Sequence, residues 1–351
     1  MSAEPEITLQ LPPSENNPRN SEGAFIQLHD GRLLFAYTHF YGGSADDAEA
    51  FIAGRYSDDG GRTWTDEDAV VLENEGGCNV MSVSFFRYQD GALGMLYLRK
   101  DHEYRLCRGF VRRSDDEGES WSEPTLATTR HTYNVVNNDR IVRLSSGRLL
   151  IPASLHHPTN GSRQPGHTTC YISDDDGQTW EMALSEISTL DDNRYGLQEP
   201  CVIELNDGRL MMLSRTAMGC HYRSYSDDEA VTWSSAEPTD LKTSCVSPSS
   251  IRRIPQTGDI LIVYNDASDI TPEYEGKRTP LVTTISRDEG ETWENRRRLE
   301  DDPDGWYCYT AIHFLDDEDT VLLGYCAGDT TRMPGLARLR ITRVPLEWIY
   351  A

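Results

Sequence analysis

Arg19, Arg215 and Arg278 are the residues of this sequence whose type and placing point most directly to a chemical task. Arg19 precedes a strand-like segment, Arg215 ends one and Arg278 begins another. A guanidinium group carries a planar fork of N–H donors that suits a carboxylate or phosphate held through two hydrogen bonds. Three such cations aimed at one cavity would repel each other unless an anion occupied it. The set therefore predicts a binding site for an anionic ligand.

Glu199 and Tyr309 could add reactive groups to that site because they occupy equivalent places in a repeated segment. The segment is an inner strand that ends just before a tight turn, and it aligns six times along the chain. The aligned position holds, in chain order, Glu22, Ser82, Asn138, Glu199, Pro248 and Tyr309. If the repeats surround an axis, these positions converge at one face, where polar and ionisable side chains can form a site. Alternatively, these side chains only bond the backbone at the strand entrances.

The elements that must position these residues are indicated by an eight-residue motif with the pattern Ser-x-Asp-x-Gly-x-Thr/Ser-Trp, here called the tryptophan turn. Its five copies begin 53 to 60 residues apart, at residues 57–64, 114–121, 173–180, 226–233 and 286–293. The Ser and Asp side chains can bond nearby backbone N–H groups, and the Gly supplies a positive φ, as in a hairpin turn. The fourth copy has Ala230 in place of Gly, which predicts a looser or differently twisted turn.

A second motif, a turn followed by a short apolar run, recurs in phase with the first. Its six copies are residues 29–37, 89–97, 145–153, 206–214, 256–264 and 317–325. Continuous apolar runs of this length are typical of strands buried on both faces. A repeat of about 57 residues corresponds to about four strands and cannot bury its own core. We therefore predict an all-β fold, a six-bladed β-propeller of four-stranded antiparallel blades, with five tryptophan turns and a ring closed by the chain termini. Residues 1–17 are expected to be a flexible N-terminal tail and residues 18–351 a single propeller domain.

The composition excludes several classes of partner. The 351 residues carry a formal net charge of −25, and nothing resembles the basic stripe that a nucleic acid requires. No apolar run approaches the roughly 18 residues of a membrane span. We therefore expect neither a nucleic-acid nor a membrane partner. Residues 1–17 contain no apolar signal core, which favours a cytoplasmic location, with a secreted or periplasmic one open if a signal peptide has been removed.

The tryptophan turns are Asp boxes, and the chain resembles the sialidase-like glycoside hydrolases along nearly its whole length. Glu199 followed by Arg215 is similar to the family's glutamate and the second arginine of its triad. Arg278, eight residues before an Asp box, is similar to the third arginine. Residues 309–315 are similar to the strand that carries the family's catalytic tyrosine, which would be Tyr309. The order of these residues along the chain is more specific than the Asp boxes alone.

The resemblance also assigns an acid/base residue and shows one departure. Asp46, ahead of the first Asp box, is similar to the family's acid/base aspartate, and Asp47 is its close rival. The family carries Arg-Ile-Pro at its first triad arginine, whereas this chain has Arg19-Asn20-Ser21 about two residues early. The missing guanidinium could come instead from Arg140 in the third repeat, here called blade 3. The substrate pocket is therefore expected to include Arg19, Asp47, Glu22, Asn138 and Arg140 beside the other two arginines.

The chemistry that the resemblance implies is a retaining exo-glycosidase, with no cofactor and no metal, that releases terminal sialic acid or a related acidic sugar from a sialoglycan. The anomeric carbon of a sialic acid bears a carboxylate, so neutral Tyr309 is a better nucleophile than a carboxylate. Glu199 would take the phenol's proton, and the arginines would lower the pKa of the phenol. Asp46, on a mobile loop, would protonate the departing oxygen and then deprotonate water.

Two other interpretations stay open. A hydrolase or lyase for another acidic sugar, for instance a uronic acid, could use the same scaffold together with His156 and His157. A lyase would form unsaturated sugars that absorb light. A non-catalytic glycan-binding propeller could also retain the arginines, although such a module needs no acid/base set.

Overall fold

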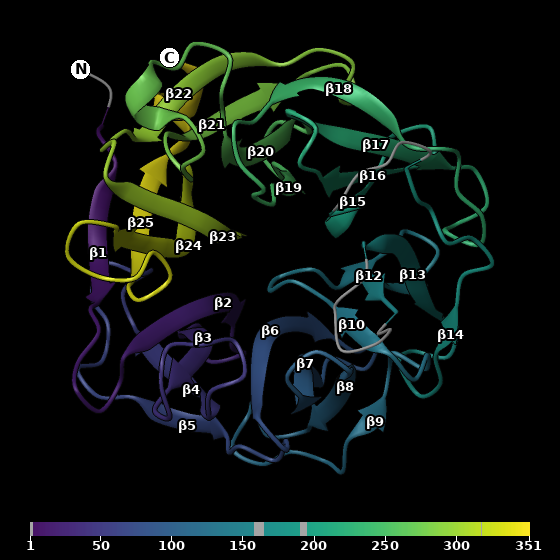
Figure 1. The fold of residues 1–351 in the computed structure, drawn as a ribbon. Coiled ribbons are helices and arrows are strands. Elements are labelled where there is room, and N and C mark those ends of the chain that lie inside the picture. Colours follow the sequence, from purple (N-terminus) through teal and green to yellow (C-terminus); the bar gives the residue numbers. More distant parts are fainter. Residues whose placement is uncertain (1–2, 158–164, 190–194, 317) are drawn as a thin grey trace.

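The fold is an all-β ring, seen in a computed structural model that describes residues 3–157, 165–189, 195–316 and 318–351. Within these residues the strands form five sheets, which surround a common centre like the blades of a propeller (Figure 1). The helical elements in this part of the chain are η1 (Pro272–Tyr274) and α1 (Leu346–Tyr350). No helix among the described residues is long and apolar enough to cross a membrane. The architecture agrees with the predicted all-β propeller class.

Three sheets have four antiparallel strands in sequential order, with the first strand nearest the centre of the ring (Figure 1). The first is β2 (Arg19–Gln27), β3 (Leu33–Phe40), β4 (Ala50–Ser57) and β5 (Ala69–Leu72). The second is β15 (Gln198–Glu204), β16 (Leu210–Arg215), β17 (Cys220–Ser226) and β18 (Glu237–Lys242). The third is β19 (Ser250–Arg253), β20 (Ile260–Asn265), β21 (Leu281–Ser286) and β22 (Glu294–Glu300).

A nine-stranded sheet departs from the predicted pattern of separate four-stranded blades. Its first part is β6 (Asn79–Arg87), β7 (Leu93–His102), β8 (Leu106–Ser114) and β9 (Thr125–Leu126). Its second part is β10 (Tyr133–Val135), β11 (Val142–Arg143), β12 (Leu149–His156), β13 (His167–Ser173) and β14 (Glu181–Met182). One parallel pairing, between Tyr133 of β10 and Cys107 of β8, joins the two parts. The count of six blades stays a prediction.

The fifth sheet brings the two ends of the chain together. Its order is β1 (Glu6–Leu11), β25 (Leu339–Pro345), β24 (Thr320–Asp329) and β23 (Gly305–Phe314). The expectation of a loose tail over residues 1–17 is wrong for Glu6–Leu11, because these residues pair antiparallel with β25. The pairing satisfies backbone groups that would otherwise be exposed along the edge of β25.

The tryptophan turns share one hydrogen-bonding scheme. In all five, the Ser hydroxyl accepts a hydrogen bond of 2.8–2.9 Å from the backbone N–H four residues later. The prediction of a looser fourth turn is wrong. Ala230 adopts a φ of +72° and donates its N–H to Ser226 just as the glycines do in the other copies. The side-chain acceptors therefore hold this left-handed backbone even where a methyl group is present.

The innermost strands carry a bulge that aims particular side chains. β2, β6, β15 and β23 each have a register shift in their pairing, and one residue inside each shift has a positive φ: Glu22 (57°), Ser82 (57°), Glu199 (42°) and Tyr309 (58°). A bulge turns a side chain out of the regular alternation, and positive φ at a non-glycine residue is typical of functional sites. The six-fold alignment is correct for these four. In blade 3 the positive φ falls on Asp139 instead of Asn138.

Candidate active site

A cavity lies among the inner strands. Its lining includes all four of the bulged side chains, which come from β2, β6, β15 and β23. The neighbouring strands contribute the remaining wall, so elements far apart in the sequence supply one site. The lining residues that bear on its chemistry are Glu22, Asp46, Ser82, Lys100, Tyr133, Asn137, His156, Gln198, Glu199, Arg215 and Tyr309.

A tyrosine, a glutamate and an arginine form a linear chain of contacts in this cavity. The Tyr309 hydroxyl donates a hydrogen bond of 3.4 Å to Oε1 of Glu199. The other carboxylate oxygen, Oε2, accepts a hydrogen bond of 2.6 Å from Nη1 of Arg215. The side chains of Glu199 and Arg215 are only 10% and 12% exposed. Gln198 accepts the remaining Arg215 donors at 2.6 and 3.1 Å, which fixes the plane of the guanidinium. These contacts hold Oε1 of Glu199 facing the phenol.

The pKa of Tyr309 is raised well above the usual tyrosine value in this structure. Burial is the main cause, followed by the negative charge of Glu199, while Arg278 and Arg215 act in the opposite direction. The two arginines lower the phenol's pKa as expected, but burial and Glu199 outweigh them, so the pKa of Tyr309 stays raised. The phenol is neutral at physiological pH and needs a base to become a nucleophile.

Arg278 supports Tyr309 and does not line the cavity. Its guanidinium carbon lies 5.2 Å from the centre of the Tyr309 ring and 5.4 Å from that of Trp306. It donates to the Cys308 sulfur at 2.9 Å and to the Val246 carbonyl at 3.0 Å. The buried cation therefore stabilises negative charge on the phenol from behind the ring.

Arg19 is bound to two carboxylates at the other side of the cavity. Its Nη1 lies 2.7 Å from Oδ1 of Asp46, and its Nη2 lies 3.4 Å from Oε2 of Glu22. The three predicted arginines therefore do not surround one empty space, because Arg19 and Arg215 are each paired with acidic groups and Arg278 lies behind Tyr309. This arrangement lowers the net positive charge that an anionic ligand would meet.

Asp46 lines the cavity, and Asp47 is not among the described lining residues. The loop that carries Asp46 was expected to be mobile, but its backbone is tied down. The Asp46 carbonyl accepts hydrogen bonds of 2.9 Å from Asn79 and 2.6 Å from Lys100. Asn79 also donates a hydrogen bond of 2.7 Å to the Ala48 carbonyl. The Asp46 side chain itself is 56% exposed, so it can reach a ligand and exchange protons with water.

Lys100, at the end of β7, is a functional candidate that the sequence interpretation missed. It is 2% exposed and lies with its ammonium 5.7 Å from the centre of the Tyr133 ring. Burial alone would lower the pKa of Lys100, but Tyr133, Cys107 and Asp46 reverse that effect and raise it. A cation at the end of an apolar strand, the signal that singled out Arg215, would have indicated Lys100 as well.

Asn138 and Arg140 are placed in structural roles outside the cavity. The Asn138 amide donates hydrogen bonds of 2.6 Å to the Gly23 carbonyl and 3.0 Å to the Tyr309 carbonyl, so it links β2 to β23. Arg140 donates 2.7 Å to the Ser249 carbonyl and is 3% exposed. The geometry gives no support to Arg140 as a replacement for the first arginine. Asn137 lines the cavity in place of Asn138.

Burial raises the pKa of Glu22, against the opposing effect of Arg19 and with a further rise from Asp46. A glutamate of an unfolded chain ionises above about pH 4.3. Wild-type stability should therefore fall as pH rises through the raised pKa of the folded state. We expect Glu22→Gln to raise the unfolding midpoint at pH 7, with the difference shrinking as the pH approaches 4. Thermal melts across this range measure it.

The exposed Glu123→Gln provides the matched control for the Glu22 prediction, since it removes one charge without changing a buried carboxyl. Its midpoint should follow that of the wild type at every pH. A Glu22→Gln protein that is less stable than the wild type at pH 7 would mean that the ion pair with Arg19 outweighs the cost of burial.

Comparisons with known proteins find relatives in sequence and in structure. The model of a family described as BNR repeat-like domain matches residues 31–322. A sialidase from Paraclostridium sordellii is 27% identical over 248 residues, which are 62% of this chain and 57% of that protein. A sialidase from Micromonospora viridifaciens is 30% identical over 196 residues, 50% of this chain and 28% of that protein. The chain thus spans only part of the length of both relatives.

A similar fold is found among solved structures. The NanB sialidase from Streptococcus pneumoniae superposes with a TM-score of 0.74, covering 99% of this chain and 71% of that one. The sequence identity is 15%, so this likeness shows the propeller fold and no more.

Proposed function

Because this chain belongs to the family of BNR repeat-like domains, and because curated sialidases are among its relatives, we propose that it is a sialidase-type glycoside hydrolase. Its substrate would be a terminal sialic acid or a related acidic sugar on a glycan, removed from the chain end with retention of configuration. We further propose a six-bladed ring in which the Asp-box turns lie at the outer edge and the bulged inner strands supply the site.

The observation that carries the proposal is the contact between Tyr309 and Glu199 in a cavity that also contains Arg215. Buried phenols also bond carboxylates elsewhere in this protein, as Tyr325 does with Glu300 at 2.7 Å. What supports the proposal is that the Tyr309–Glu199 pair lines a cavity beside Arg215, where proton transfer to Glu199 would make the phenol a nucleophile. The carboxylate is positioned by Arg215, so Oε1 stays directed at the phenol. A glycan-binding module would have no use for this pair.

In the first step, Glu199 takes the phenol proton while the Tyr309 oxygen bonds to the anomeric carbon of the sugar. The bond from that carbon to the glycan oxygen breaks, and Asp46 donates a proton to this departing oxygen. In the second step, Asp46 takes a proton from water, whose oxygen replaces Tyr309 at the same carbon. The phenolate leaves and recovers its proton from Glu199, so that two inversions give net retention.

Arg215 and Lys100 are the cations that line the cavity together with these groups, and they would bind the substrate carboxylate. Arg278 and Arg19 act from outside the lining, through Tyr309 and Asp46 respectively. The pocket would therefore bind an anionic group through cations, as the sequence predicted. Lys100 would supply one of the positive charges that was expected from a third arginine.

Hydrolysis of a fluorogenic α-sialoside by the purified protein tests the proposal. We expect release of the fluorophore, and proton NMR should show the α-anomer of the sugar as the first product. First formation of the β-anomer would exclude a glycosyl-enzyme intermediate. No release from sialosides, with release from a fluorogenic uronide, would transfer the proposal to another acidic sugar.

A further inference from the structure

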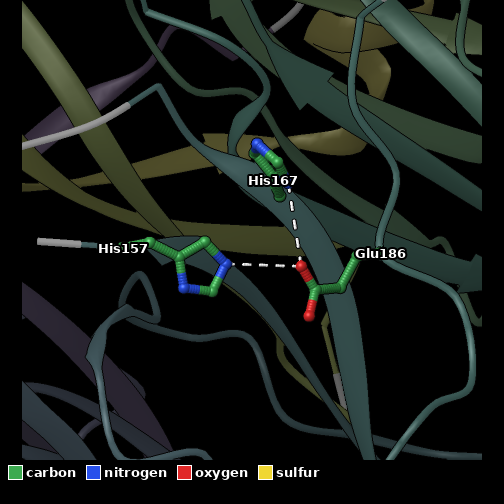
Figure 2. Close-up of side chains that lie close together, drawn as sticks. All are labelled: His157, His167 and Glu186. Carbon is green, nitrogen blue, oxygen red and sulfur yellow. Dashed lines mark hydrogen bonds and ion pairs between the residues drawn. The ribbon is translucent and has the colours of Figure 1, made fainter. Parts of the chain in front are cut away.

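Two histidines and a glutamate converge on one point (Figure 2). None of the three is among the residues that line the cavity, although His156, the neighbour of His157, is. The Nε2 atom of His157 lies 3.4 Å from Oε2 of Glu186, and Nδ1 of His167 lies 3.7 Å from the same oxygen. One candidate ligand atom from each of the three side chains lies within 4.8 Å of the others. This cluster plays no part in the function proposed above.

The backbone holds the cluster on three neighbouring segments. His157 directly follows β12, and His167 begins β13, which pairs antiparallel with β12. Glu186 stands next to Ile187, which forms an isolated antiparallel bridge with Thr168. The two N–H···O bonds of that bridge are 2.8 and 2.9 Å long. The pairing of β12 with β13 and the bridge at Thr168–Ile187 therefore bring the three side chains side by side.

Two imidazoles share a single carboxylate oxygen in this cluster, with ring centroids 5.7 Å apart. Imidazole nitrogens and a carboxylate oxygen gathered around one point are donors that zinc binds in proteins. A tetrahedral zinc ion with bonds of about 2.0–2.1 Å has ligand atoms roughly 3.3–3.4 Å apart. The two nitrogen–oxygen separations of 3.4 and 3.7 Å are close to that spacing, and all three candidate ligand atoms lie within 4.8 Å of one another, so side-chain rotations would complete the coordination.

We propose that His157, His167 and Glu186 bind a divalent transition-metal ion, with zinc as the ion that fits best. Two imidazole nitrogens and one carboxylate oxygen suit zinc, whereas calcium and magnesium prefer sites made of oxygen alone. The three side chains are 36%, 38% and 27% exposed, so an ion can enter from solvent and water can take the fourth position. The ion replaces the two histidine–glutamate contacts with three coordinate bonds.

The site is structural in its effect. The backbone N–H of Gly166, next to His167, donates a hydrogen bond of 2.9 Å to the Tyr195 carbonyl. The Gly166 carbonyl accepts one of 2.9 Å from the backbone N–H of Leu197. Leu197 immediately precedes β15, the strand that carries Glu199. A bound ion therefore ties together β12, β13 and the segment between β14 and β15 that carries Glu186. It stabilises the folded state by its binding free energy.

Isothermal titration calorimetry with zinc chloride tests the proposal on the full chain, prepared without a polyhistidine tag and stripped with a chelator. We expect one zinc ion per chain and a higher unfolding midpoint in its presence. His157→Ala and His167→Ala should each weaken zinc binding by about tenfold or more. Glu186→Gln should weaken it as well. Calcium chloride at the same concentrations should give no binding.

His29→Ala is the matched control. His29 faces Glu117 at 3.2 Å on the surface, as the proposed ligands do, but with a single imidazole. Its substitution should leave zinc affinity unchanged. A wild-type protein that binds no zinc at several times its own concentration overturns the proposal. Affinity that survives in His157→Ala, His167→Ala and Glu186→Gln, with circular dichroism showing that all three are folded, overturns it equally.

Discussion

Replacing Tyr309 with Phe should reduce the turnover of a sialoside by on the order of 10³–10⁶-fold while leaving its binding nearly intact. The change removes only the hydroxyl, whose hydrogen bond of 3.4 Å to Glu199 begins the proposed reaction. The ring stays packed against Arg278, whose guanidinium carbon lies 5.2 Å from the ring centre, so the wall of the cavity keeps its shape. Steady-state kinetics give kcat, and calorimetry with a non-hydrolysed sialic-acid analogue gives the affinity.

Tyr307→Phe is the control for this experiment. Tyr307 lies two residues earlier in β23, is 4% exposed and belongs to the apolar core instead of the cavity lining. Loss of its hydroxyl should leave kcat unchanged. Wild-type turnover in Tyr309→Phe would remove Tyr309 from the mechanism, whereas loss of binding as well as turnover would mean that the hydroxyl contacts the substrate directly.

Replacing Glu199 with Gln should lower kcat by about 10²–10⁴-fold, because an amide of the same shape cannot take the phenol's proton. The substitution also removes a negative charge beside Tyr309. Since that charge raises the pKa of the phenol, the pKa of Tyr309 should fall in the variant. Kinetics measure the first effect. An ultraviolet difference titration against the double variant that also carries Tyr309→Phe measures the second.

Glu204→Gln, at the other end of β15, separates this effect from a general loss of charge. Glu204 accepts hydrogen bonds from Ser145 on a neighbouring blade and does not line the cavity. Its kcat should match that of the wild type. Full activity in Glu199→Gln would assign the base to another residue and leave the ion pair with Arg215 as a purely structural feature.

The sequence by itself determined the propeller class and the central residues of the site. Both are local signals that repeat. The Asp-box turns depend on hydrogen bonds within eight residues, and the inner strands show the same spacing to the following turn. Aligning the repeats therefore identified Glu22, Ser82, Glu199 and Tyr309 as equivalent, and the structure places all four in one cavity.

The alignment failed where backbone conformation varies without an outward sign in the sequence. In blade 3 the left-handed residue is Asp139, one position later than predicted, and this shift turns Asn138 toward the Gly23 and Tyr309 carbonyls. Blade 5 is a different case, because the sequence itself signals the departure: the aligned residue is Pro248, whose ring fixes a negative φ and excludes the bulge conformation.

Only the tertiary structure decided which charges meet. Asp46 and Arg19 are 27 residues apart and pair at 2.7 Å, while Lys100 reaches the same loop from the next blade. Tyr309 meets Glu199 across 110 residues. Side-chain partners on different blades follow from how the blades close around the axis, and no local pattern encodes that closure. The state of each charge, including the raised pKa of Tyr309, depends on burial that exists only once the ring has formed.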